Sequence, residues 1–132
     1  VNVCVQALKD ANGNLDKAIS LIKERGQASA RNYESRETKA GMIGVYQHHN
    51  KQIAAMVMLG CETDFVARMP NFIIFANALA QHVVAMNPSS KEELLKQPYI
   101  LFPDDTVEQT LLVFSGLCKE KVSIENFQRL EV

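Results

Sequence analysis

Cysteine is scarce in this chain of 132 residues, and the three that occur are far apart. Cys4, Cys61 and Cys118 are odd in number, and their spacing fits neither a zinc knuckle nor a disulfide framework. A reducing intracellular compartment is therefore the expected environment. Neither sign of charge is in excess, because 14 Lys and Arg residues against 15 Asp and Glu residues leave a formal charge of -1. We therefore expect no direct nucleic-acid partner.

Long hydrophobic runs are also missing. The longest apolar stretch, residues 72–86, is interrupted by Asn77, Gln81 and His82. It is too short and too polar to cross a bilayer, and no signal peptide precedes it, so no membrane association is expected. The chain begins with Val1 instead of Met. We expect the N-terminus to be processed or truncated, so that any targeting segment would not be visible.

Patterns typical of catalysis are missing too. There is no glycine-rich phosphate loop, and no Cys, His and Asp set has the spacing of an activated nucleophile. His48 and His49 are adjacent on a predicted strand, where their side chains would point to opposite faces and could not share one ion. His82, on the apolar stretch, is expected to be a half-buried or edge histidine. We therefore expect no enzymatic activity, no cofactor and no metal.

The first 40 residues favour two short helices followed by a tether. Residues 1–26 carry the helical pattern, with Asn14 as the predicted cap of the second helix and Gly26 as its predicted end. Two such helices bury little surface alone and need another helix, a partner or the main body. Residues 27–40 are polar, which fits either a solvated helix or a linker, and we interpret them as a mobile linker.

Residues 41–132 predict an α+β main body. Two strands, around residues 43–45 and 53–59, are joined by a turn at residues 49–51 and form an antiparallel hairpin. Pro70 opens a long helix whose apolar stripe is wide enough to imply burial on two sides. Residues 121–132 alternate as a closing strand, with an irregularity predicted near Asn126. The expected fold is a three-stranded antiparallel sheet packed with helices.

Two shorter helices are predicted between the long helix and the closing strand. Residues 90–93 have capping-box spacing for a helix that ends before Pro98. Residues 105–108 repeat the pattern, with the carboxylates of Asp105 and Glu108 as the expected caps of a helix that runs to about Leu117.

The junction between the hairpin and the long helix, residues 61–68, reads Cys-Glu-Thr-Asp-Phe-Val-Ala-Arg. Cys61 is expected to pack as a small core hydrophobe. Two interpretations of the central pair stay open. Phe65 fills the core while Asp64 caps the next helix, which composition alone favours, or Phe65 projects as a wedge into a partner.

This segment, with residues 42–50 (Met-Ile-Gly-Val-Tyr-Gln-His-His-Asn) and 85–88 (Ala-Met-Asn-Pro), closely resembles the elongation factor Ts family. Residues 7–14 resemble the later part of that family's ubiquitin-associated-like helical domain, whose first helix is absent. The resemblance implies a partial ubiquitin-associated-like domain at 1–26, a linker at 27–40 and a dimerisation and exchange core at 41–132. It also implies the short form of the family, which dimerises to supply two core modules.

The resemblance implies a guanine nucleotide exchange factor that promotes GDP release from the GTPase elongation factor Tu during translation elongation. Phe65 would enter an apolar pocket near the partner's phosphate and magnesium site, with Asp64 beside it. The partner-binding residues carried over are Thr63, Asp64, Phe65, Val66, Arg68 and, less specifically, His48. The location implied is a bacterial cytoplasm or an organelle matrix, in a mitochondrion or plastid.

The chain also departs from the family pattern. Met69-Pro70 replaces an Asn and an acidic residue, residues 119–121 replace a Gly-Glu-Asn turn, and Glu125-Asn126 replaces an Arg pair. A long helical insertion before Pro98 is reduced to one short helix. These departures support an alternative hypothesis, in which the fold serves as a non-exchanging structural subunit of a larger assembly.

Overall fold

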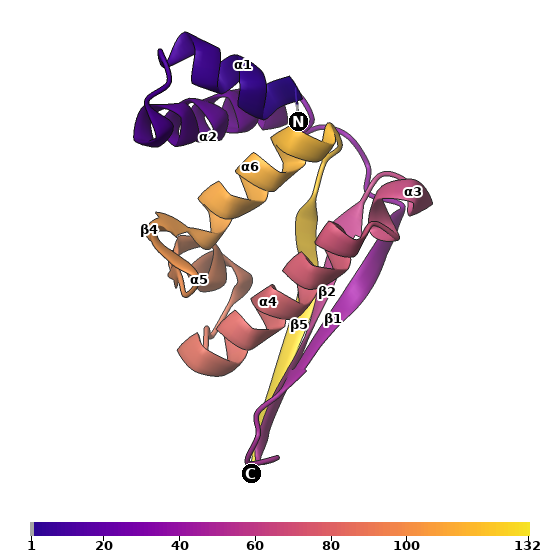
Figure 1. Ribbon diagram of the computed structural model, residues 1–132. Helices are drawn as coiled ribbons and strands as arrows, with labels where there is room; N and C mark the ends of the chain where they lie inside the picture. Colours follow the sequence, from indigo (N-terminus) through magenta and orange to yellow (C-terminus); the bar gives the residue numbers. More distant parts are fainter. Residues whose placement is uncertain (1) are drawn as a thin grey trace.

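The computed structural model describes residues 2–132, with side chains from Val5 onward, so Val1 and the expectations for the Cys4 side chain lie outside the described part. The mixed helix-and-strand fold predicted from the sequence is confirmed (Figure 1). The elements in chain order are α1 (Asn2–Asp10), α2 (Leu15–Arg31), β1 (Ala40–Gln47), β2 (Ile53–Cys61), α3 (Asp64–Ala67), α4 (Pro70–Met86), α5 (Lys91–Lys96), β3 (Pro98–Tyr99), β4 (Phe102–Thr106), α6 (Val107–Cys118) and β5 (Ser123–Glu131).

The main sheet has the strand order β1-β2-β5, and both strand pairs are antiparallel. The predicted hairpin is confirmed, with Ala40 opposite Cys61 at one end and Gln47 opposite Ala54 at the other. The register between β2 and β5 shifts after Met58, so Glu125 is one extra residue on β5. This bulge is the irregularity predicted near Asn126.

Helix α4 covers one face of this sheet (Figure 1). It begins with Pro70 at the first helical turn, where a missing N–H costs little. A Cβ at Gly44 of β1 would lie 2.1 Å from the backbone of Ala76, so only glycine permits this close approach of helix and strand. The side chain of Asn77 accepts the backbone N–H of Val45 at 3.0 Å, which satisfies a donor on the edge strand.

The apolar stripe of α4 is buried on two sides, as its width predicts. One side faces the sheet, and on the other Phe75 stacks on Phe114 of α6 with ring centroids 4.8 Å apart. Phe72, which is fully buried, meets the same ring edge-on. Ile73, Ile74 and Met86 are exceptions, because they remain 39%, 64% and 38% exposed. Within residues 2–132, neither α4 nor any other helix has the length and apolar character needed to cross a membrane.

His82 of α4 is fully buried, so the expectation of a half-buried or edge histidine is wrong. Its Nδ1 accepts the backbone N–H of Ile100 at 3.3 Å, which leaves the proton on Nε2 to be donated to the Gln97 side chain at 2.9 Å. Burial lowers the pKa of His82 below its usual value of 6.5. The ring is thus a neutral, fully hydrogen-bonded core residue.

Two further helices and a small ribbon complete the body. Ser90 caps α5 as predicted, accepting the N–H of Glu93 at 3.1 Å. The cap of α6 is Thr106 in a reciprocal box with Gln109, so the prediction of Asp105 and Glu108 as the caps is wrong. Asp105 instead pairs with Lys23 of α2 at 2.8 Å. The β3–β4 ribbon was not predicted, because each strand is only two to five residues long.

The two N-terminal helices form a hairpin that packs on α6. Asn14 caps α2 as predicted. The predicted end at Gly26 is wrong, since α2 continues to Arg31. Gly26 instead lies at the crossing with α6, where a Cβ on Gly116 would be 2.0 Å from the Gly26 carbonyl oxygen. Gly26 therefore permits close packing of α2 on α6 and does not end α2.

The segment after α2, interpreted as a mobile tether, is hydrogen-bonded to the core, and its mobility stays a prediction. Lys121 Nζ donates to the Glu34 carbonyl at 2.8 Å, and Thr38 donates to the carboxylate of Glu125 at 2.5 Å. Arg36 and Glu62 form an ion pair at 3.3 Å. The ubiquitin-associated-like character of the hairpin and the division into domains stay predictions.

Candidate functional site

The junction between β2 and α3 turns the chain sharply at the end of the sheet. Cys61 closes β2 inside the core and donates its thiol to the Thr63 carbonyl at 3.2 Å. The complete burial of Cys61 confirms the prediction of a core hydrophobe, and it raises the pKa of the thiol to about 11. Thr63 is extended and is the N-cap of α3, with its hydroxyl accepting the N–H of Val66 at 3.4 Å.

Helix α3 divides its side chains between the core and solvent. Val66 and Ala67 are 4% and 1% exposed, whereas Phe65 is 80% exposed. The interpretation of Phe65 as a core residue is therefore wrong. Large apolar rings are usually buried, and one this exposed on a helix anchored by its neighbours has the geometry of a contact residue. The burial of Val66 conversely does not fit the partner contact expected for it.

Two glutamates hold this junction to the turn after α6. Glu120 Oε1 accepts the backbone N–H of Glu62 at 3.2 Å and that of Thr63 at 3.0 Å. Its Oε2 accepts the Thr63 hydroxyl at 2.7 Å. In return, Glu62 Oε2 accepts the backbone N–H of Lys121 at 2.6 Å. We call this reciprocal pair the Glu62–Glu120 clamp.

Asp64 and Arg68 flank Phe65 on the exposed side of α3. Asp64 lies in the first helical turn but is not the cap, because Thr63 occupies that position. It borders a groove of about 700 Å³ that runs along the paired Gly41 and Gly60. Arg68 ends the helix. The surface around Phe65 therefore offers an apolar ring with a carboxylate at the first residue of the helix and a guanidinium at its C-cap.

His48 does not lie near this cluster. It precedes the hairpin turn, at the end of β1 remote from Cys61. At the rise of a β-strand, the eight residues of β1 separate the two ends by about 25 Å. The Tyr46 hydroxyl lies 3.3 Å from His48 Nδ1. The His48 and His49 rings are 4.1 Å apart, so the prediction that they point to opposite faces is wrong.

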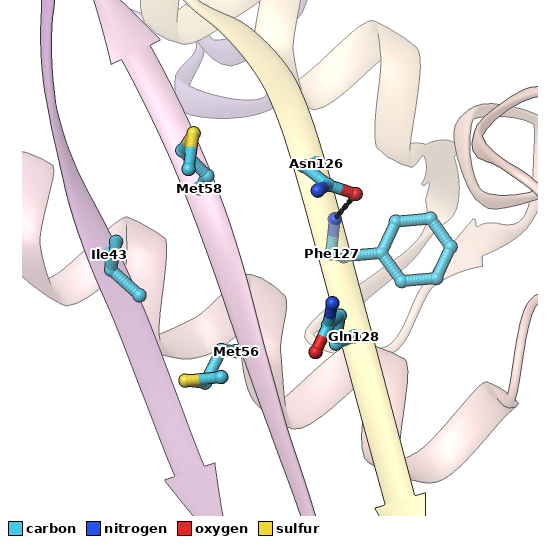
Figure 2. A pocket seen from close by; sticks show the side chains of 6 residues that line it. All are labelled: Ile43, Met56, Met58, Asn126, Phe127 and Gln128. Atoms are coloured by element: carbon cyan, nitrogen blue, oxygen red, sulfur yellow. Dashed lines mark hydrogen bonds between the residues drawn. The ribbon is translucent and has the colours of Figure 1, made fainter.

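A surface that sequence reasoning missed is the sheet face opposite α4. Figure 2 shows Ile43 of β1 beside Met56 and Met58 of β2, with Asn126 and Gln128 on β5. The three apolar side chains, and Val45 on the same strand as Ile43, are exposed. Alternation could have revealed this surface, because apolar residues occupy both faces of β1 and β2, whereas an open antiparallel sheet usually has one polar face.

Among residues 5–132, whose side chains the structure describes, no group of three or more His, Cys, Asp or Glu side chains could hold a metal ion. What the junction offers is a contact surface built on Phe65, Asp64 and Arg68 and held in place by the clamp. The exposed sheet face offers a second contact surface, which is apolar at its centre and meets the carboxylate of Glu125 near Gly60.

Comparison with known proteins agrees with the resemblance. The model of the family described as Elongation factor TS matches residues 62–132, from the clamp to the C-terminus. Elongation factor Ts of Thermosipho melanesiensis is 49% identical over 85 residues, covering 64% of this chain and 43% of that protein. Elongation factor Ts of Fervidobacterium nodosum is 38% identical over 119 residues, which cover 89% of this chain and 56% of that protein.

More distant relatives extend over nearly all of the chain. Elongation factor Ts of Clostridium kluyveri is 33% identical over 129 residues, covering 98% of this chain and 42% of that protein. The chain thus spans about half the length of the curated relatives it matches.

Proposed function

Because this chain belongs to the elongation factor Ts family, we propose that it acts as a guanine nucleotide exchange factor in translation elongation. Its partner is the GTPase elongation factor Tu, and its action is to promote GDP release. The observation that carries the proposal is the exposure of Phe65 on a short helix whose other apolar residues are buried. The site of action is a bacterial cytoplasm or an organelle matrix, where the partner works.

Exchange of this kind needs only differential binding. A factor that binds the nucleotide-free GTPase more tightly than the GDP-bound form lowers the affinity for GDP, and GDP lowers the affinity for the factor by the same ratio. In this proposal the ring of Phe65 fits between two helices of elongation factor Tu, near its phosphate and magnesium site. The ring fits there only when the contacts between the GTPase and its nucleotide are disturbed, so Phe65 favours the nucleotide-free form. A buried aromatic anchor is the kind of residue that dominates an interface.

The neighbours of Phe65 take different roles in this proposal. Asp64 and Arg68 are exposed on the same short helix and contact the partner around the ring. Thr63 and Val66 orient the helix, one as its cap and the other through the core. His48 contacts the partner at a second place, because it lies at the far end of the hairpin.

We also propose that the exposed sheet face joins two copies of this chain. Ile43, Val45, Met56 and Met58 form an exposed apolar surface that Asn126 and Gln128 border with neutral side chains. Beyond Met58, over Gly60, this surface meets the carboxylate of Glu125. In a two-fold interface the same surface meets itself, so the apolar centre of this face can pack against its own copy without placing like charges together there. Light scattering at micromolar concentration is expected to give the mass of a dimer. A monomer from the native chain, or an unchanged dimer from Met56→Glu, would contradict this interface.

The exchange function is tested by the release of fluorescent GDP from elongation factor Tu. The expected result is a release rate that rises with the concentration of this chain and then saturates. Excess unlabelled GDP is expected to lower the affinity of the two proteins for each other by the same factor by which this chain lowers the affinity for GDP. A chain that binds elongation factor Tu but leaves the release rate unchanged would overturn the proposal and favour the structural-subunit alternative.

A further inference from the structure

Helix α3 contains only four residues, which is too short to be stable on its own. Its orientation therefore depends on what holds each end. The burial of Val66 and Ala67 fixes one side. The start of the helix is fixed from outside, by the three hydrogen bonds that the Glu120 carboxylate accepts from Glu62 and Thr63.

Glu120 is itself held in a defined position. Its backbone carbonyl accepts the hydroxyl of the buried Ser115 at 2.5 Å, and its N–H donates to the Ser115 carbonyl at 3.3 Å. Lys119, immediately before it, ends α6 in the left-handed conformation with φ of 62°. The turn that carries Glu120 is thus tied to α6, which packs against both α2 and the aromatic side of α4.

We propose that Glu120 is a positioning residue that holds α3 in the orientation in which Phe65 is presented to the partner. The inference rests on the proposed exchange function and extends it to a residue 55 positions away in the chain. It also gives Thr63 a different role. Its hydroxyl donates to Glu120 and accepts the Val66 N–H, so it serves the junction and has no further proton to donate to a partner.

The variants that test this are Glu120→Ala, Glu120→Gln and a matched control, Glu93→Ala. Glu93 also accepts a backbone N–H and a hydroxyl, both from Ser89, but it does so at the start of α5. We expect Glu120→Ala to lower the acceleration of GDP release by roughly tenfold, which corresponds to about 1.4 kcal/mol. Glu120→Gln keeps an acceptor for the two N–H groups and is expected to recover most of the acceleration. Glu93→Ala is expected to match the native chain.

A double variant separates positioning from general destabilisation. Phe65→Leu keeps a smaller apolar side chain, so measurable exchange should remain. If Glu120 acts through residue 65, Glu120→Ala will have a smaller effect on the Phe65→Leu background than on the native one. Equal fold losses on both backgrounds, with equal melting temperatures of the variants, would overturn the positioning role.

Hydrogen exchange of the free chain gives a readout that does not depend on any partner. The amides of Glu62 and Thr63 donate to Glu120, so Glu120→Ala should speed their exchange while amides of β1 stay protected. Unchanged exchange at both amides would overturn the inference even if the native chain accelerates GDP release. Faster amide exchange with no acceleration by the native chain would instead remove the proposed function and leave the clamp intact, and the positioning role would fall with that function.

Discussion

The α1–α2 hairpin and the α/β core use opposite kinds of side chain. The buried cluster of the hairpin consists of Ala7, Ala11 and Ala18, with two larger residues only partly buried beside it. The core around α4 instead buries aromatic and branched residues from β2, β5 and four helices, with Met42 and Tyr46 of β1 partly buried against them. Alanine contributes little hydrophobic area, so the hairpin depends on docking to α6 for its stability. The core is stabilised by the large apolar area that its own side chains bury.

The contrast is clearest in two kinds of helix contact. Between α4 and α6, the rings of Phe72, Phe75 and Phe114 fill the space. Between α2 and α6, Gly26 and Gly116 remove side chains so that the backbones approach. One contact loses stability when a side chain is deleted, and the other when a side chain is added.

The largest effect is expected from Phe72→Ala in the core. Deleting a fully buried ring removes its transfer free energy and leaves a cavity, so the free energy of unfolding should fall by about 3–5 kcal/mol. Chemical denaturation measures this change, with Phe102→Ala on the exposed ribbon as control. A loss of less than about 1 kcal/mol would contradict the assignment of the core.

A smaller effect is expected from Gly116→Val at the hairpin contact. A Cβ there meets the backbone of Gly26, which cannot move aside as a flexible side chain would. Overpacking of this kind costs about 1–3 kcal/mol, and here it should release the hairpin and leave the core folded. Faster amide exchange in α1 and α2, with unchanged exchange in β2, is the expected pattern. Leu117→Val is the control. Equal loss of amide protection in the hairpin and in the core would contradict a hairpin that docks as a separate unit.

His82 makes the core, but not the hairpin, sensitive to mild acid. Its folded pKa is lowered by burial, so the unfolded chain binds a proton more readily than the folded one. The stability contributed by neutral His82 is therefore present above pH 6.5 and is lost as pH falls below that value. Denaturation at several pH values from about 7.5 to 5.5 should show this loss, above the range in which carboxylates titrate. His82→Gln should remove most of the slope, and an identical slope would contradict the assignment.

The smallest effect is a gain, expected from Lys119→Gly. Lys119 has a φ of 62° at the end of α6, a conformation that favours glycine. Glycine removes the Cβ strain, so the free energy of unfolding should rise by about 0.5–1 kcal/mol. Lys121→Gly, two residues on, is expected to destabilise and serves as the control. A loss of stability with Lys119→Gly would show that the Lys119 side chain makes a compensating contact.

Regular elements with strong local signals were predictable from the sequence. Pro70 before an apolar stripe, the hairpin turn and the polar caps at Asn14 and Ser90 each act within a few residues, and each is confirmed. Gly26 misled because the same residue type that ends helices also permits their close contact, and only the tertiary structure distinguishes the two. The β3–β4 ribbon is too short to carry a periodic pattern.

The candidate site was only partly predictable. Phe65 and its neighbours stand in one uninterrupted segment, but composition favoured a buried ring, and its exposure depends on how α3 is turned. That orientation is set by Glu120, which is remote in sequence and carries no local signal. Apolar residues on both faces of β1 and β2 signalled the exposed sheet face, but which of the two faces α4 covers is known only from the structure.

The most direct test of the account compares two exposed rings. Phe65 is 80% exposed on α3 and Phe102 is 63% exposed on the β3–β4 ribbon, so neither ring contributes much to the core. Phe65→Ala and Phe102→Ala should both keep the native melting temperature. In GDP release from elongation factor Tu, Phe65→Ala should lose at least about 2 kcal/mol of acceleration, roughly thirtyfold, while Phe102→Ala keeps it. Equal activity of Phe65→Ala and the native chain would contradict the central claim.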